Sequence, residues 1–265
     1  MARTVTVLAS AAMVRPGFLT ALAVAALAAL LSGCSTTPAP APVFDDVQPF
    51  SANRPGAALP RGWRPWIINR SKSPTQYDLV VDPKSQAVVL HAVADRAASG
   101  LKQRLDVDAA ARPVVQWRWR VTGLIPLADN TARDVEDSPV RLMLFFDGDR
   151  RALPASELVK FELAKMVTGQ EPPYATLMYI WENRQPVGTV IASGHTSRVQ
   201  MVVAGSGDDR LGQWKGFERN YAEDFRRAFG EAPGRLIGVG ILTDTDNTGE
   251  RIEAFYGDIR LRAAR

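Results

Sequence analysis

The stretch Val114–Val121, which reads VVQWRWRV, decides the fold class of this chain. Its apolar residues occupy every second position, and the positions between them hold Gln116, Arg118 and Arg120. A period of two places these two sets of side chains on opposite faces of a β-strand. The segment therefore predicts a strand with one buried face and one wetter face, as is typical of antiparallel sheets.

Eight further segments show strand-like patterns bounded by Pro, Gly, Asp and Asn clusters, which are typical of turns. They are Tyr77–Val81, Ala87–Val93, Val140–Phe146, Ala175–Trp181, Val187–Ala192, Arg198–Ala204, Leu236–Leu242 and Ile252–Leu261. The first two predict a hairpin. This many strands joined by short connections favour a mostly β fold, an antiparallel β-sandwich of jelly-roll type.

Only two segments predict short helices. Ser156–Val167 carries a broad apolar stripe that includes Leu158 and Phe161. Asn220–Phe229 begins with a capping box, because Asn220 is followed three residues later by Glu223, and Gly230 marks its end. We expect the apolar face of this second helix to pack in the core.

The N-terminus has the layout of an export signal. An apolar run of about 14 residues from Phe18 to Leu31 is shorter than the roughly 20 residues of a membrane-spanning helix. Translation starting at Met13 instead of Met1 would give a more compact signal. The run ends in Leu31-Ser-Gly-Cys34, which resembles the lipobox of bacterial lipoproteins. That resemblance implies a signal peptide over residues 1–33, a lipid on Cys34 and fatty acylation of the new amino terminus.

The resemblance also predicts a location, because Ser35 after the cysteine implies the periplasmic face of the outer membrane. Residues 34–59 are rich in Pro and Ala and predict a tether, which leaves 60–265 as the β-sandwich domain. Cys34 is the only cysteine, so the domain forms no disulfide. The formal charge of +4 is spread along the chain without a basic block, so the sequence lacks the basic patch typical of nucleic-acid-binding proteins.

Several motifs taken together resemble a bacterial family known as domain of unknown function 3047, over roughly Pro60 to the C-terminus. The motifs are Pro60–Trp63, Thr75–Val80, Ala98–Leu101, Trp117–Val121, Leu177–Trp181, Phe229–Gly230 and Thr243–Gly249. This resemblance implies the domain boundary and no particular activity. The pattern also resembles sandwich modules that bind sugars, which is a likeness of fold only.

The loop Asp244-Thr-Asp-Asn-Thr-Gly249 is the most site-like in the sequence. Its oxygen-bearing side chains resemble the start of an EF-hand, although Phe255 stands where the loop's closing Glu belongs. We predict a possible Ca²⁺ site with Asp244, Asp246 and Asn247 as ligands. The alternative is an Asx-rich turn between two strands, which these residues also favour.

A second candidate site comprises Trp117, Arg118, Trp119, Arg120 and, on the next predicted strand, Arg141. The tryptophans are candidates for stacking on sugar rings, and the arginines for binding carboxylates or phosphates. The alternative, favoured by the period-two pattern, is that both tryptophans lie in the core.

The acidic run Asp134, Glu136 and Asp137 offers carboxylates for general acid and base catalysis. Alternatively, it is a solvated loop that pairs with nearby arginines. The chain has two histidines, His91 and His195, and no nucleophile motif or zinc signature, so we assign no catalytic residue.

The sequence thus leads to three functional hypotheses. The first is an envelope lipoprotein whose sandwich binds a ligand, in particular an envelope polysaccharide. The alternative is a polysaccharide hydrolase or lyase that uses carboxylates in a groove of the sandwich. A third is a structural partner of another envelope protein, which a large exposed apolar patch would favour.

Overall fold

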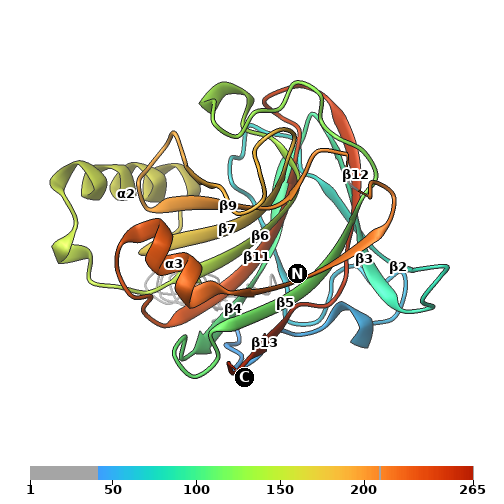
Figure 1. Ribbon diagram of the computed structural model, residues 1–265, viewed down its shortest axis with the longest axis horizontal. Coiled ribbons are helices and arrows are strands. Elements are labelled where there is room, and N and C mark those ends of the chain that lie inside the picture. Colours follow the sequence, from blue (N-terminus) through green and yellow to red (C-terminus); the bar gives the residue numbers. More distant parts are fainter. Residues whose placement is uncertain (1–40, 209, 265) are drawn as a thin grey trace, which may run out of the picture. The chain divides into compact units, whose positions relative to one another are not determined.

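The computed structural model describes residues 41–208 and 210–264. These residues form a β-sandwich of two facing sheets (Figure 1), as the alternating pattern predicts. The predicted signal peptide, the two possible start residues Met1 and Met13, and Cys34 lie outside the described residues. Within the described part of the chain, no helix is long and apolar enough to cross a bilayer.

The larger sheet has seven strands. In spatial order they are β1 (Arg64–Trp66), β4 (Ala98–Val107), β11 (Leu236–Asp244), β6 (Ser138–Phe146), β7 (Ala175–Glu182), β9 (Val199–Ser206) and β8 (Val190–Ala192). Neighbouring strands are antiparallel except for β7 and β9, which run parallel and depart from the all-antiparallel prediction. All nine residues of β6 are buried, so this central strand has protein on both faces.

The smaller sheet has six strands. They are β10 (Trp214–Asn220), β5 (Val114–Val121), β12 (Arg251–Tyr256), β3 (Val88–Asp95) and β2 (Gln76–Val81) in order, with β13 (Arg260–Arg262) also paired to β5. The predicted strand Ile252–Leu261 is interrupted at Gly257, where a Cβ atom would lie 2.4 Å from the side chain of Arg118. Strands β1, β4 and β10 have no counterpart in the sequence prediction.

The main core lies between the sheets and is rich in aromatic rings. Trp117 of β5 stacks on Phe217 at 5.0 Å and lies 4.8 Å from Tyr179 of β7, so it joins the two sheets. Trp119 is fully buried beside it, at a ring distance of 5.4 Å. The period-two pattern of β5 is thus confirmed, with the apolar set pointing inward.

Helix α3 (Tyr221–Phe229) follows β10 and forms as predicted. The Asn220 side chain accepts a hydrogen bond from the backbone of Glu223, and Gly230 ends the helix in the left-handed conformation with φ 74°. Phe225 is buried and packs on Phe146 of β6 at 4.7 Å. Three short 3₁₀ turns occur as well: η1 (Phe50–Ala52), η2 (Arg133–Val135) and η3 (Arg150–Ala152).

Helix α2 (Ala155–Thr168) lies on the far side of the seven-stranded sheet from the smaller sheet (Figure 1). The helix forms as predicted, but only Phe161 of its apolar stripe is buried, together with the polar Glu157. The Glu157 carboxylate holds the β8–β9 loop by accepting hydrogen bonds from Thr196 and from the backbone of Ser197. The remaining apolar side chains of α2 therefore face outward.

The predicted tether ends earlier than residue 59. Val47 and Phe50 lie in the main core, and the indole of Trp63 donates to the backbone of Gln48 at 2.9 Å. Backbone bonds from Phe44 to β4 extend this packing toward the N-terminus. The packed unit therefore includes chain from Ala41 onward, because apolar residues spaced among the prolines have a core to enter.

Candidate functional site

A row of polar and aromatic side chains crosses the outer face of the six-stranded sheet. Strand register places Trp214 beside Arg120, Arg120 beside Phe255, and Phe255 beside His91. The Arg120 guanidinium lies 3.9 Å from the centre of the Phe255 ring and 5.6 Å from that of Trp214. His91 stacks on Phe255 at 4.4 Å. The row is half-buried, so its edges face solvent.

Asp82 fixes one end of this row. It accepts a hydrogen bond from the indole of Trp214 at 3.1 Å and lies 3.8 Å from the Arg120 guanidinium. Burial acts to raise the pKa of Asp82, but hydrogen bonds from Ser85 and Trp214 outweigh it and lower the pKa to about 2. Asp82 is therefore ionised at neutral pH and holds both partners in place.

Arg118 differs from Arg120 in having no ionic partner. It lies 4.7 Å from the centre of the Trp214 ring, and no carboxylate of the described residues comes within ion-pair distance of it. It lines a shallow groove of about 530 Å³ at this edge of the sheet. The other groove-lining residues are Gln116, Trp117, Gly216, Phe217, Glu218, Asp258 and Arg260. A Cβ at Gly216 would meet nothing within 4 Å, so the groove is open there.

The predicted five-residue site is not one surface. Trp117 borders the groove but is only 4% exposed, and Trp119 is 0% exposed, so neither presents a ring face to a ligand. Arg141 belongs to β6 in the other sheet and is 2% exposed. The prediction of Trp117, Trp119 and Arg141 as ligand-binding residues is therefore corrected, because strand alternation directs both rings into the core and pairing places β6 away from β5.

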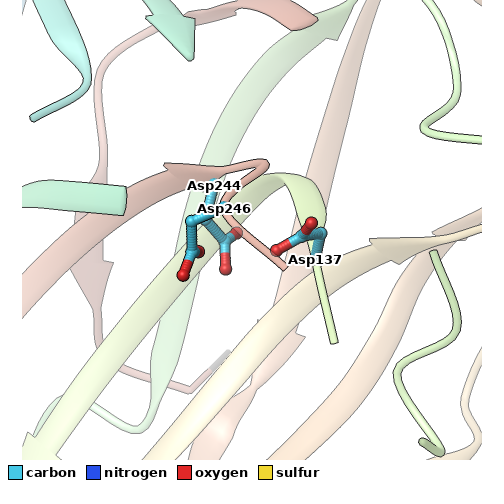
Figure 2. A group of neighbouring side chains, drawn as sticks. All are labelled: Asp137, Asp244 and Asp246. Atoms are coloured by element: carbon cyan, nitrogen blue, oxygen red, sulfur yellow. The ribbon is translucent and has the colours of Figure 1, made fainter. Parts of the chain in front are cut away.

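A group of three carboxylates lies where β11 ends and β6 begins (Figure 2). Asp244 and Asp246 lie side by side and Asp137 faces them, with oxygen atoms within 4.8 Å of one another. Asp137 comes from the acidic run that precedes β6. This arrangement brings together the two acidic segments that the sequence singled out separately.

Cationic side chains already contact this group. Arg141 donates from Nε to Asp244 at 2.9 Å and from Nη2 to its second oxygen at 3.1 Å, and Lys72 lies 2.9 Å from Asp246. Burial raises the pKa of Asp244 to about 7, against the opposing effect of Arg141. Burial acts to lower the pKa of Arg141, but Asp244 and Glu136 outweigh it and raise that pKa.

Backbone groups hold the remaining acidic side chain. Asp137 is fully buried and accepts hydrogen bonds from the backbone of Asn247 and from the backbone and hydroxyl of Thr248. The side chain of Asn247 donates to the carbonyl of Glu136 at 3.3 Å. These contacts tie the loop after β11 to the start of β6, and within the loop the backbone of Gly249 donates to the carbonyl of Thr245 at 3.0 Å. A Ca²⁺ site at Asp244, Asp246 and Asn247 stays a prediction, and ion binding there has to compete with Arg141 and Lys72.

The enzymatic alternative requires carboxylates that face a groove. Asp137 and Asp244 are close enough to one another but buried, and both accept several hydrogen bonds from the protein. Glu136 lies 3.6 Å from Arg141, as the ion-paired alternative for this loop expects. The group of Asp137, Asp244 and Asp246 therefore gives no specific support to the hydrolase or lyase hypothesis.

Sequence reasoning missed two residues of the outer face, Trp214 and Phe255. Phe255 alternates with the buried Ala254 and Tyr256, so its outward direction was readable from the sequence once β12 was assigned. Trp214 begins β10, a strand whose polar sequence carries no clear alternation. Asp137 was a candidate through the acidic run, but the sequence gave no signal that it lies beside Asp244 and Asp246.

Comparisons with known proteins give one sequence family and several distant folds. None of the curated sequences that were compared matches the chain. The solved structures with a similar fold include an arabinose-bound α-L-arabinofuranosidase at 10% identity and a TM-score of 0.40, which covers 84% of this chain. The chain spans 27% of that enzyme's length.

Two further structures match over nearly their whole length. Endoglucanase 3 of Trichoderma harzianum has 8% identity and a TM-score of 0.39, covering 83% of this chain and 98% of its own. The K1 adhesin domain of Lys-gingipain from Porphyromonas gingivalis has 7% identity and a TM-score of 0.36, covering 83% and 99%. The family model for proteins of unknown function DUF3047 matches residues 61–260, and the chain belongs to this family.

Proposed function

We propose that this protein is an envelope lipoprotein, held by a lipid on Cys34 at the periplasmic face of the outer membrane, that binds acidic polysaccharide. The binding surface is the outer face of the six-stranded sheet around Arg118 and Trp214. The observation that carries the proposal is the Arg118 guanidinium, which lies over the Trp214 ring at the edge of an open groove and has no carboxylate partner in the described part of the chain.

The chemistry of this surface suits a sugar that carries a negative charge. A guanidinium binds carboxylate or phosphate through two parallel hydrogen bonds. The contact with Trp214 holds the Arg118 side chain in one orientation, which lowers the entropic cost of binding. Gln116 and Glu218, which hydrogen bond to each other in the groove, offer partners for sugar hydroxyl groups.

Arg120 has a different role from Arg118. Because Asp82 neutralises it and the rings of Phe255 and Trp214 flank it, it serves as a support for the surface. We therefore expect the anionic group of the ligand to pair with Arg118. Arg260 lines the same groove and lies 4.0 Å from Asp258, which also lines it. Among the described groove residues, Arg118 is therefore the cation that has no carboxylate partner.

Binding to polygalacturonate, a polymer of uronic acids, tests the proposal, with uncharged dextran as the reference polymer. Arg118→Gln should lower the affinity for polygalacturonate by about tenfold or more, since a charged hydrogen-bond pair contributes roughly 1.5–3 kcal/mol. Arg151→Gln is the matched control, because that arginine is exposed and pairs with Asp149 on another surface. Equal binding of both polymers, or equal loss in both variants, would refute an acidic-glycan site at Arg118.

The lipid anchor has its own test. Cys34→Ala should move the protein from the membrane to the soluble fraction and remove the mass of the lipid from the mature chain. Unchanged fractionation and mass would contradict the anchor while leaving the glycan experiment intact.

A further inference from the structure

The helix α2 exposes most of its apolar side chains. Met166 is 79% exposed, Val167 61%, Val159 60% and Leu163 55%. Inward-facing positions recur at Glu157 and Phe161, one helical turn apart, so the opposite half of the helix is left without a protein partner among the described residues. Exposed apolar surface that is contiguous in this way marks an interaction site.

The cations around this helix are paired within the chain. Lys160 pairs with Glu157 at 2.8 Å, and Lys165 pairs with Glu171 at 2.8 Å. Arg150 also contacts Glu171 and lies over the ring of Phe161. An acidic partner would need unpaired cations to bind to, and these cations already have carboxylate partners. The surface therefore favours an apolar partner. Glu162 lies within the exposed half and lines a shallow apolar groove with Leu158 and Leu163.

The start of the described chain and the residues after α2 both contact side chains on one face of β4. The Arg104 guanidinium contacts the carbonyl of Ala41 at 3.3 Å, and Lys102 contacts Gln170, which follows α2 by two residues. Lys102 and Arg104 are two residues apart on β4, so both point to the same face at a spacing of about 7 Å. The chain therefore enters the domain on the same side of the seven-stranded sheet as the C-terminal end of α2.

A lipid on Cys34 would place this side close to the bilayer. Ala41 follows Cys34 by seven residues, and a chain of that length spans at most about 25 Å when fully extended. We propose that the exposed face of α2, comprising Leu158, Val159, Leu163, Met166 and Val167, docks on the lipid surface that holds the anchor. Apolar side chains of such a helix enter the boundary between headgroups and acyl chains, and Glu162, which lies on the same face, limits how deeply they enter.

The inference deepens the proposed function, since it rests on the lipid anchor and sets the orientation of the glycan-binding domain. The two are separable by experiment. The anchor is tested by fractionation of Cys34→Ala, whereas docking is tested in lipidated protein that is already vesicle-bound. Because the cations around the helix are already paired, anionic lipid should not strengthen docking.

An environment-sensitive NBD dye on Met166→Cys in the full lipidated chain measures docking. In phosphatidylethanolamine and phosphatidylglycerol vesicles, we expect its emission to shift to shorter wavelength and to be quenched by doxyl-labelled lipids. The same dye on Lys84→Cys, an exposed turn residue of the six-stranded sheet, should keep its aqueous emission. Adding Leu163→Glu to Met166→Cys should abolish the shift, and because Leu163 is exposed the protein should stay folded.

Three results would overturn the docking proposal. One is aqueous emission from position 166 while the lipidated protein sediments with vesicles. Another is a shift that appears without vesicles and grows with protein concentration, which would assign the face to a second copy of the chain. The last is a shift that requires an added envelope protein, which would assign it to a protein partner.

Discussion

Replacing Arg141 with Met should be among the most damaging single changes in the sandwich. Arg141 is 2% exposed and makes two hydrogen bonds to Asp244 and one, at 2.8 Å, to the carbonyl of Glu136. Met retains much of the apolar volume but leaves these acceptors without their donor. Breaking a buried ion pair by removing one partner costs about 3–5 kcal/mol, and we expect a loss of this size at pH 7.

The loss should also depend on pH. In the wild type the pKa of Asp244 is raised to about 7, so above pH 7 its carboxylate is ionised with the help of Arg141. Without Arg141 the pKa of Asp244 rises further, while its value in the unfolded chain stays near 4. A folded-state pKa above the unfolded value means that stability falls as pH rises through that range. The deficit of Arg141→Met should therefore widen above pH 7, by up to about 1.4 kcal/mol per pH unit.

Urea unfolding at pH 7, 8 and 9 measures both effects, with an unchanged dependence on urea concentration showing that the same structure unfolds. Arg151→Met is the control, because Arg151 forms an exposed pair with Asp149 and should lose less than about 1 kcal/mol. If Arg141→Met loses no more than this control, or if its deficit stays constant with pH, the buried pair does not stabilise the junction of β6 and β11 in the way described.

Two further predictions concern stability. Lowering the pH from about 4 to 2 should reduce the free energy of unfolding by about 2 kcal/mol through Asp82 alone, because folding lowers the pKa of Asp82 from 3.8 to about 2. Stability of this origin is lost as the pH falls through the folded-state pKa. The melting temperatures of the wild type and Asp82→Asn should therefore converge over this range, and parallel curves would contradict the prediction. Gly100→Ala should destabilise the protein by about 1–3 kcal/mol, since the added Cβ would lie 2.3 Å from the carbonyl oxygen of Ile241. Gly216→Ala is the control, because open space surrounds that position and the melting temperature should change little. Equal melting temperatures for the two alanine variants would show that β4 and β11 adjust to the clash.

Much of the architecture was predictable because its determinants are local. The alternation in β5 assigned each residue to a face, and the cap residues Asn220 and Gly230 marked both ends of α3. Such signals depend on residues a few positions apart. Strand β4 was not predicted although it pairs on both sides, with β1 and β11, because polar Lys102 and Gln103 and the close contact at Gly100 interrupt its apolar pattern.

The candidate site shows the limit of local information. The sequence predicted that Arg118 and Arg120 face away from the core, and the structure confirms it. It did not predict that Asp82 pairs with Arg120 while Arg118 has no carboxylate partner among the described residues and lines a groove. Those contacts join β5 to β10 and to the β2–β3 turn. Arg141 was grouped with them from its neighbouring position in the chain, whereas strand order places β6 in the opposite sheet.

The sequence by itself determined the sandwich class, the direction of side chains along its clearest strand, the family resemblance and the predicted anchor at Cys34. Only the tertiary structure decided which charged groups are already neutralised and which remain available. The physical reason is that alternation assigns a residue to one face of its strand, while the partner on that face comes from strands distant in sequence. For α2 the same reason decided that a stripe of apolar residues faces outward, because a helix turns toward whichever partner the rest of the fold supplies.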